Sequence, residues 1–237
     1  MPVDLGTLKV FADGADRAGI LRYRAHPLIQ GFTTNPTLMR KAGVDDYESF
    51  ALELVELVPD LPISFEVFAD DFDDMERQAL KIAAWGTNVY VKIPVTDTSG
   101  RSTVPLQRRL ADQGVQTNVT ALMTVPQVEA VADAIGSGPS AFISVFAGRI
   151  ADTGRDPVPL LQDALAVIAD RPHLEMIWSS PREVLNIVQA AAIGCHVITV
   201  TYDLLEKLPI FDKDLDEYSL ETVRMFFDDA ARAGYSL

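Results

Sequence analysis

One lysine has the most distinctive chemical setting in this sequence. Lys92 lies in the segment VYVKIP, where Val89, Val91 and Ile93 alternate with bulkier or polar residues, as expected for a β-strand with two unlike faces. An ordinary lysine is protonated at neutral pH, whereas burial away from water favours the free amine that can attack a carbonyl carbon. The segment therefore predicts a Schiff-base lysine. The alternative is a lysine that extends to solvent or pairs structurally with Glu66.

Two carboxylates stand near the ends of other predicted strands. Asp13 closes the segment LKVFAD, and Glu66 lies late in PISFEVF. Carboxyl groups in different surroundings can divide proton-transfer work between them. The alternative for Asp13 is a turn or a helix N-cap in ADGADR, a frequent position for aspartate.

Polar side chains share one face of several predicted strands, while the other face is apolar. In a barrel the apolar face meets the surrounding helices, so the polar set should point inward; it comprises Glu66, Lys92, Asn118, Thr120 and Ser144. Such groups are costly to bury unless they pair or bind a ligand. This face is therefore predicted to form the wall of an active site.

Cationic side chains follow two later strands. Arg149 and Arg182 come just after segments 141–147 and 174–180, where barrel enzymes often bind phosphate. An exposed helix arginine is the alternative for each. The sequence TTNP at 33–36 predicts a strand exit followed by a helix that begins at Pro36. The three histidines show no spacing suited to a metal site.

Short apolar or alternating runs recur along the chain and alternate with helix-period segments. The predicted strands are 8–13, 30–35, 62–68, 88–94, 115–121, 141–147, 174–180 and 196–201. Ser180 with Pro181 predicts the start of one helix, and Ser219 precedes the last helix. Eight strand–helix units predict an α/β protein with a single (β/α)8 TIM barrel and a C-terminal helix. A doubly wound open sheet is the alternative, although no G-x-G-x-x-G or Walker A sequence is present.

Composition narrows the classes of partner. Lys and Arg number 20 against 34 Asp and Glu, so the formal net charge is −14. This charge disfavours nucleic acids and anionic membranes as partners, and an anionic substrate would need a local group of cations. One cysteine excludes an internal disulfide. We expect a cytoplasmic protein, because neither a signal sequence nor an apolar spanning segment is visible.

Several segments in order resemble the transaldolase family, which includes a fructose-6-phosphate aldolase branch. They are FADGA (11–15), GFTTNPTLMRKAG (31–43), SFEV (64–67), VKIP (91–94), GVQTNVT (114–120) and SVFAGRI (144–150). The resemblance implies a single barrel domain over 1–237 that acts in carbohydrate metabolism, in the pentose phosphate pathway. It also implies a homo-oligomer that binds small-molecule sugar phosphates and needs neither a cofactor nor a metal.

The resemblance also implies residue roles. Lys92 would form a Schiff base with a ketose phosphate, Asp13 would deprotonate the C4 hydroxyl, and Glu66 with a water near Thr120 would shuttle protons. The implied substrate-binding residues are Thr33, Asn35, Asn118, Ser144, Phe146, Arg149, Ser180 and Arg182.

Two positions distinguish the branches of the family. The aldolase branch usually has Gln at the position of Glu66 and Tyr at that of Phe146, so the residues found here favour transfer of a dihydroxyacetone unit to an aldose phosphate. A simple aldolase, another sugar-phosphate aldolase and a non-catalytic sugar-phosphate-binding barrel are the alternatives.

Overall fold

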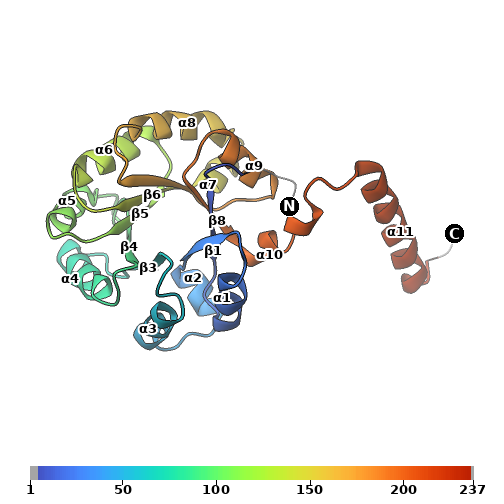
Figure 1. The fold of residues 1–237 in the computed structure, drawn as a ribbon, viewed down its shortest axis with the longest axis horizontal. Helices are drawn as coiled ribbons and strands as arrows, with labels where there is room; N and C mark the ends of the chain where they lie inside the picture. The colour runs from blue at the N-terminus through green and yellow to red at the C-terminus, as the bar shows by residue number, and fades with distance from the viewer. Residues whose placement is uncertain (1–4, 236–237) are drawn as a thin grey trace. The chain divides into compact units, whose positions relative to one another are not determined.

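A closed barrel of parallel strands forms the larger of two compact units. The structure, a computed structural model, describes residues 5–235, and the units are residues 5–205 and 206–235 within that range. The strands are β1 (Lys9–Asp13), β2 (Ile29–Thr33), β3 (Ile63–Glu66), β4 (Val89–Pro94), β5 (Thr117–Leu122), β6 (Ala141–Val145), β7 (Leu174–Trp178) and β8 (Val197–Thr201). They pair in chain order, and β8 closes onto β1 (Figure 1). The predicted TIM barrel is confirmed.

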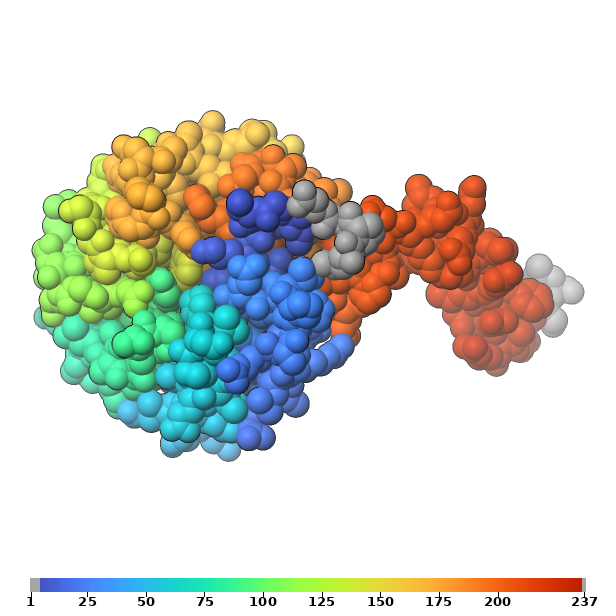
Figure 2. Space-filling view, viewed as in Figure 1, coloured from blue at the N-terminus to red at the C-terminus, as the bar shows by residue number. Residues whose placement is uncertain are grey.

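Helices follow the strands and surround the barrel. In the larger unit they are α1 (Arg17–Arg24), α2 (Pro36–Lys41), α3 (Tyr47–Leu57), α4 (Phe72–Ala83), α5 (Val104–Asp112), α6 (Val125–Ile135), α7 (Ala147–Ala151), α8 (Pro157–Val167), α9 (Leu185–Ala192) and α10 (Tyr202–Leu205). The segments of this unit succeed one another around the barrel in chain order (Figure 2). Each βα connection therefore delivers its residues to the same end of the barrel.

Capping residues explain where several helices begin. Asn35 accepts a hydrogen bond from the Leu38 amide and caps α2, whose first residue is Pro36 as predicted. Asp16, rather than Asp13, caps α1. The prediction that a helix begins at Ser180 and Pro181 is wrong, because Ser180 takes a left-handed backbone conformation (φ 58°) and α9 starts at Leu185.

The smaller unit contains the short 3-10 helix η1 (Leu208–Ile210) and the long helix α11 (Leu215–Ala233). The predicted start of this last helix after Ser219 is wrong, because Asp214 accepts a hydrogen bond from the Glu217 amide and caps the helix earlier. The predicted C-terminal helix itself is confirmed. The single-domain and homo-oligomer expectations stay predictions. Among the described residues, no helix has the length and apolar character required to cross a membrane.

Alternation along the strands separates the core from the barrel interior. The outward residues Val89, Val91 and Ile93 of β4 are almost fully buried, as expected for side chains covered by helices. Inside the barrel, Phe11 packs edge-on against Phe142 with ring centroids 5.5 Å apart, and Tyr90 lies 4.2 Å from Phe142. These aromatic rings form a cluster with Ile177 and Val197, nearer the amino ends of the strands. The polar residues nearer the carboxyl ends of the strands are thus left to line a cavity.

Candidate active site

A cavity of about 540 Å³ lies at the carboxyl ends of the strands. The predicted site residues that line it are Asp13, Thr33, Asn35, Glu66, Lys92, Asn118, Thr120, Ser144, Phe146, Arg149 and Ser180. They come from seven of the eight strands or from the segments that directly follow them, including Arg149 on α7. The barrel therefore gathers almost the whole predicted set at one end, where TIM barrels carry out their chemistry.

Strand register fixes the surroundings of Lys92. On adjacent strands Lys92 lies opposite both Glu66 and Asn118, so all three side chains enter the cavity at one level. The Lys92 side chain is only 9% exposed, and its Nζ lies 3.3 Å from Glu66 Oε2. The same amine donates a hydrogen bond to the Thr34 carbonyl oxygen at 2.9 Å. Lys92 is thus held inside the cavity and does not extend to bulk solvent.

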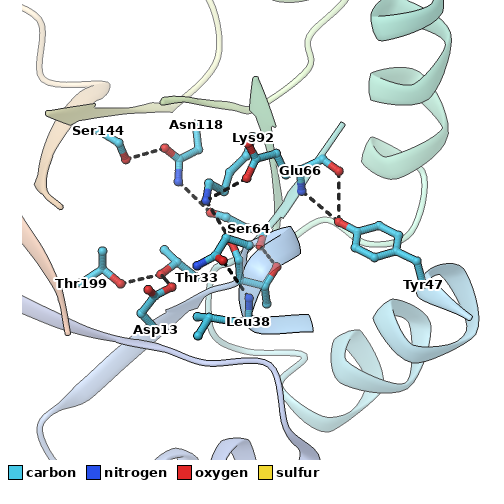
Figure 3. A network of polar contacts seen from close by, with 12 residues as sticks. Asp13, Thr33, Leu38, Tyr47, Ser64, Glu66, Lys92, Asn118, Ser144 and Thr199 are labelled. Carbon is cyan, nitrogen blue, oxygen red and sulfur yellow. Dashed lines mark hydrogen bonds and ion pairs between the residues drawn. The ribbon is translucent and has the colours of Figure 1, made fainter. Parts of the chain in front are cut away.

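Tyr47, on α3, holds the backbone on which Glu66 stands. Its hydroxyl donates to the Glu66 carbonyl oxygen at 3.1 Å and accepts from the Glu66 amide at 3.0 Å (Figure 3). Burial raises the pKa of the Tyr47 hydroxyl well above its usual range, so it stays a neutral donor and acceptor. The Glu66 carboxylate is left available to Lys92 and to the cavity.

A chain of hydroxyl groups orients Asp13. Thr33 donates to Asp13 Oδ1 at 2.7 Å, so the 2.5 Å contact between the Thr199 and Thr33 hydroxyls requires Thr199 to be the donor there. Burial raises the pKa of the Asp13 carboxyl, while the charge of Lys92 and the hydrogen bond from Thr33 oppose this rise. A carboxyl group with a raised pKa takes up a proton more readily than an ordinary one, which suits a group that accepts and returns a proton.

Asn118 is fixed by two serines. Its Nδ2 donates to Ser64 Oγ at 3.0 Å, and its Oδ1 accepts from Ser144 Oγ at 2.7 Å (Figure 3). These bonds determine which way the amide points and leave its second N–H for a ligand. Three strands, β3, β5 and β6, are thereby tied together across the cavity wall.

Thr120 differs from its neighbours in the hydrogen bonding of its hydroxyl group. Its Oγ1 is buried and makes no hydrogen bond to any residue that the structure describes. The next residue, Ala121, has a left-handed backbone conformation (φ 65°) and lies within the register shift of the β5–β6 pairing between Val119 and Leu122. Buried hydroxyl groups usually find partners, so a free one that faces a cavity indicates a site for water or substrate.

The two predicted arginines lie in different places. Arg149, on α7, lines the cavity, whereas Arg182 does not. Arg182 instead makes a two-pronged ion pair with Asp152, from Nε to Oδ1 at 2.9 Å and from Nη2 to Oδ2 at 2.5 Å. The structure thus brings together every predicted site residue except Arg182.

Sequence reasoning did not single out several residues of the cavity wall. The cavity lining also includes Ser179, Thr199 and Thr201, and Ser64 accepts a hydrogen bond from Asn118. The alternation of β8 could have identified Thr199 and Thr201, because they share a face of the segment VITVT. Within residues 5–235, no group of three or more His, Cys, Asp or Glu side chains is arranged to hold a metal ion.

Comparison with known proteins finds relatives over nearly the whole chain. The family model described as transaldolase/fructose-6-phosphate aldolase matches residues 10–237. A relative named "Probable transaldolase" from Dehalococcoides mccartyi is 32% identical over 215 residues, which is 89% of this chain and 96% of that protein. A relative of the same name from Thermoanaerobacter sp. is 33% identical, over 89% of this chain and 95% of its own.

Solved structures show the same fold at low sequence identity. KGPDC from Streptococcus mutans superposes with a TM-score of 0.58 at 11% identity, over 85% of this chain and 91% of that chain. Because that identity is low, the likeness concerns the barrel architecture alone. The sequence matches cover nearly the whole chain and identify its family. They show that the chain belongs to the transaldolase/fructose-6-phosphate aldolase family.

Proposed function

We propose that this protein is a transaldolase that moves a dihydroxyacetone unit from a ketose phosphate of the fructose 6-phosphate type to an aldose phosphate. The observation that carries the proposal is the buried Lys92 amine, 3.3 Å from the Glu66 carboxylate inside the cavity. Lys92 lines the cavity in which a ketone would bind, and Glu66 is near enough to exchange protons with the reacting groups. The unprotonated amine is the nucleophile for a ketone carbon.

The first half of the reaction forms the imine. Lys92 Nζ adds to the C2 carbonyl carbon of the donor, and the carbonyl oxygen takes up a proton to give a carbinolamine. Protonation of that hydroxyl by Glu66 releases water and leaves a protonated imine. The free Thr120 hydroxyl, on the strand next to Lys92, is placed to hold this water.

The second half breaks a carbon–carbon bond. Asp13 takes the proton of the C4 hydroxyl, the C3–C4 electron pair moves into the imine, and the C4 aldehyde fragment leaves. The enamine that remains adds to the aldehyde of the acceptor, and Asp13 returns its proton to the new hydroxyl. Imine hydrolysis, which reverses the first steps, releases the product and frees Lys92.

The remaining cavity residues have binding roles in this proposal. Asn35, Asn118 and Ser144 offer hydrogen bonds for the hydroxyl groups of the dihydroxyacetone unit. Arg149 supplies a guanidinium group for the phosphate, with Ser179 and Ser180 beside it in the cavity wall.

Trapping of the imine tests the proposal. Incubation with fructose 6-phosphate and borohydride is expected to add one reduced three-carbon or six-carbon unit to Lys92, found by mass spectrometry of peptides. Lys9→Met is a matched control, because Lys9 pairs with Glu175 at the other end of the barrel interior. Lys92→Met should lose both the adduct and transfer, whereas Lys9→Met should keep both.

Two outcomes would contradict the proposal in different ways. If Lys92 stays unmodified although the protein is folded and binds the sugar phosphate, the protein would be a non-catalytic sugar-phosphate-binding barrel. Rapid release of free dihydroxyacetone without an acceptor, together with a normal adduct, would assign an aldolase instead of a transferase.

A further inference from the structure

Arg149, Ser179 and Ser180 form the end of the cavity that we call the distal end, where the phosphate would bind. One of the two predicted arginines is missing from its lining. Arg149 is there with Ser179 and Ser180, while Arg182 stands outside the lining although it follows the same strand as the serines. Two nearby guanidinium groups would suit a phosphate dianion. In this protein only one of the two faces the cavity.

Asp152 accounts for the position of Arg182. Both of its carboxylate oxygens accept from the guanidinium, through Nε at 2.9 Å and Nη2 at 2.5 Å. The hydrogen bond from Arg182 lowers the pKa of Asp152, and the charge of Arg149 adds a smaller effect in the same direction, so the ionised carboxylate is favoured. The Asp152 carboxylate thus occupies the Arg182 guanidinium beside the proposed phosphate site.

Hydrogen bonds fix the backbone around this ion pair, whereas its side chains are partly exposed to solvent. The Arg182 amide donates to Asn186 Oδ1 at 2.7 Å, and the Glu183 amide donates to the same atom at 3.1 Å. The Arg182 and Asp152 side chains are 45% and 48% exposed. Ion pairs that are this exposed contribute little to stability, so a competing anion can exchange for the carboxylate.

We propose that Asp152 is a specificity-determining residue that holds the Arg182 guanidinium away from the cavity and thereby weakens the binding of a dianionic phosphate group. The cavity lining then presents one of the two guanidinium groups, that of Arg149, so a donor whose phosphate-end group has a single charge is at less of a disadvantage. This inference rests on the proposed function, because it concerns the distal end of the same substrate. It assigns a new role to a residue outside the cavity lining.

Anion binding measures the effect without requiring turnover. Calorimetric titration with inorganic phosphate at pH 7.5 and constant ionic strength compares the natural protein with Asp152→Asn. We expect the variant to bind phosphate about two- to five-fold more tightly, the range that an exposed ion pair allows. Methanesulfonate, which has one charge, should gain less. The KM for fructose 6-phosphate should fall in parallel with the dissociation constant of phosphate.

Two further variants make the test specific. Asp133→Asn removes the same charge from another exposed pair, in which Arg171 lies 2.7 Å from Asp133, and should leave phosphate affinity unchanged. If Asp152 acts through Arg182, the gain of Asp152→Asn should disappear when Arg182→Met is added.

Equal or weaker phosphate binding by Asp152→Asn, or no measurable binding by either protein, would overturn the inference. A carboxylate that merely orients Arg182 toward the ligand would give the weaker binding. The proposed function fails on a separate observation, the absence of the Lys92 adduct, which leaves the phosphate titrations interpretable.

Discussion

Lys92 and Glu66 are register partners on neighbouring parallel strands, and their charged atoms Nζ and Oε2 lie 3.3 Å apart inside the barrel. Two hydrogen bonds with Tyr47 fix the backbone of Glu66, so the place of residue 66 in the wall does not depend on its carboxylate. Mutagenesis of residue 66 can therefore separate the position of its side chain from its ability to carry a proton. The position of the side chain at 66 is set by the fold, and its ability to carry a proton is set by its chemistry.

Glu66→Gln should therefore keep the structure and slow the reaction. Glutamine has nearly the same shape but cannot transfer a proton, so we expect kcat for transfer to fall by about a hundred-fold or more. Stopped-flow measurement of transfer, with thermal unfolding as the check on stability, tests this expectation. The matched control is Glu175→Gln, which alters the Lys9–Glu175 pair at the opposite end of the barrel. Unchanged turnover in Glu66→Gln would remove Glu66 from the proton route.

Asp13 should make stability depend on pH in an identifiable direction. Its pKa is raised by burial, so the folded state binds a proton more readily than the unfolded chain does. The free energy of unfolding should therefore decrease as pH rises from the ordinary aspartate value through the folded pKa. Asp13→Asn removes this penalty, and we expect it to be more stable than the natural protein at pH 7.5 but inactive. The difference should narrow at pH 4.5, as measured by urea unfolding.

Asp97 provides the opposite case in the same barrel. Although burial opposes it, hydrogen bonds from Ser99 and Arg101 keep the pKa of Asp97 at about 2. Asp97→Asn should therefore lower the free energy of unfolding at pH 7.5, and its loss should shrink only as pH falls toward 2. If both variants shifted stability in the same direction, the assigned burial of Asp13 would be wrong.

Thr120 offers a test of a hydroxyl group with no structural partner. Its Oγ1 bonds to no described residue, whereas the Thr103 hydroxyl donates to the Pro94 carbonyl oxygen at 2.6 Å. Thr120→Val should leave stability unchanged or slightly higher and reduce kcat, because the water for imine hydrolysis loses its ligand. Thr103→Val should do the reverse, with a loss of about 1 kcal/mol in stability and normal kcat. Kinetics and urea unfolding of both variants separate the two effects.

Strand periodicity made the fold and most of the site predictable. The predicted strands match the observed ones to within two residues at each end, and the residues placed on the inner face do line the cavity. This success has a physical cause. In a closed parallel barrel, alternation decides which face a side chain occupies, and all carboxyl ends meet at one rim.

The distal end was harder to predict because it depends on loop geometry. Ser180 has a left-handed conformation, and a Cβ on Gly148 would lie 1.6 Å from the Ser180 carbonyl oxygen, so the chain takes a path that only glycine at 148 permits. This path carries Arg182 to Asp152. Periodicity contains no information about such a turn, nor about a partner 30 residues distant in sequence.

Tyr202 and Gly14 form a contact that sequence reasoning also missed, next to the catalytic candidate Asp13. A Cβ on Gly14 would lie 2.1 Å from Tyr202 Cζ, and one on Gly19 would lie 2.1 Å from Tyr202 Cε2. The same ring stacks on Tyr23 with centroids 4.7 Å apart. The two glycines therefore make room for a ring that is confined on several sides, and the ring packs against the loop that follows Asp13.

Gly14→Ala should therefore destabilise the protein by about 1–3 kcal/mol, the usual cost of overpacking, and lower activity by displacing Asp13. Tyr202→Ala opens the space, so the double variant should lose less than the sum of the two single losses. Gly154→Ala is the control: its surroundings are open, its cost of about 1–2 kcal/mol comes from backbone conformation, and it should add to Tyr202→Ala without coupling. Urea unfolding of the four proteins in each cycle measures the coupling. Strict additivity of Gly14→Ala with Tyr202→Ala would show that the ring does not confine this loop.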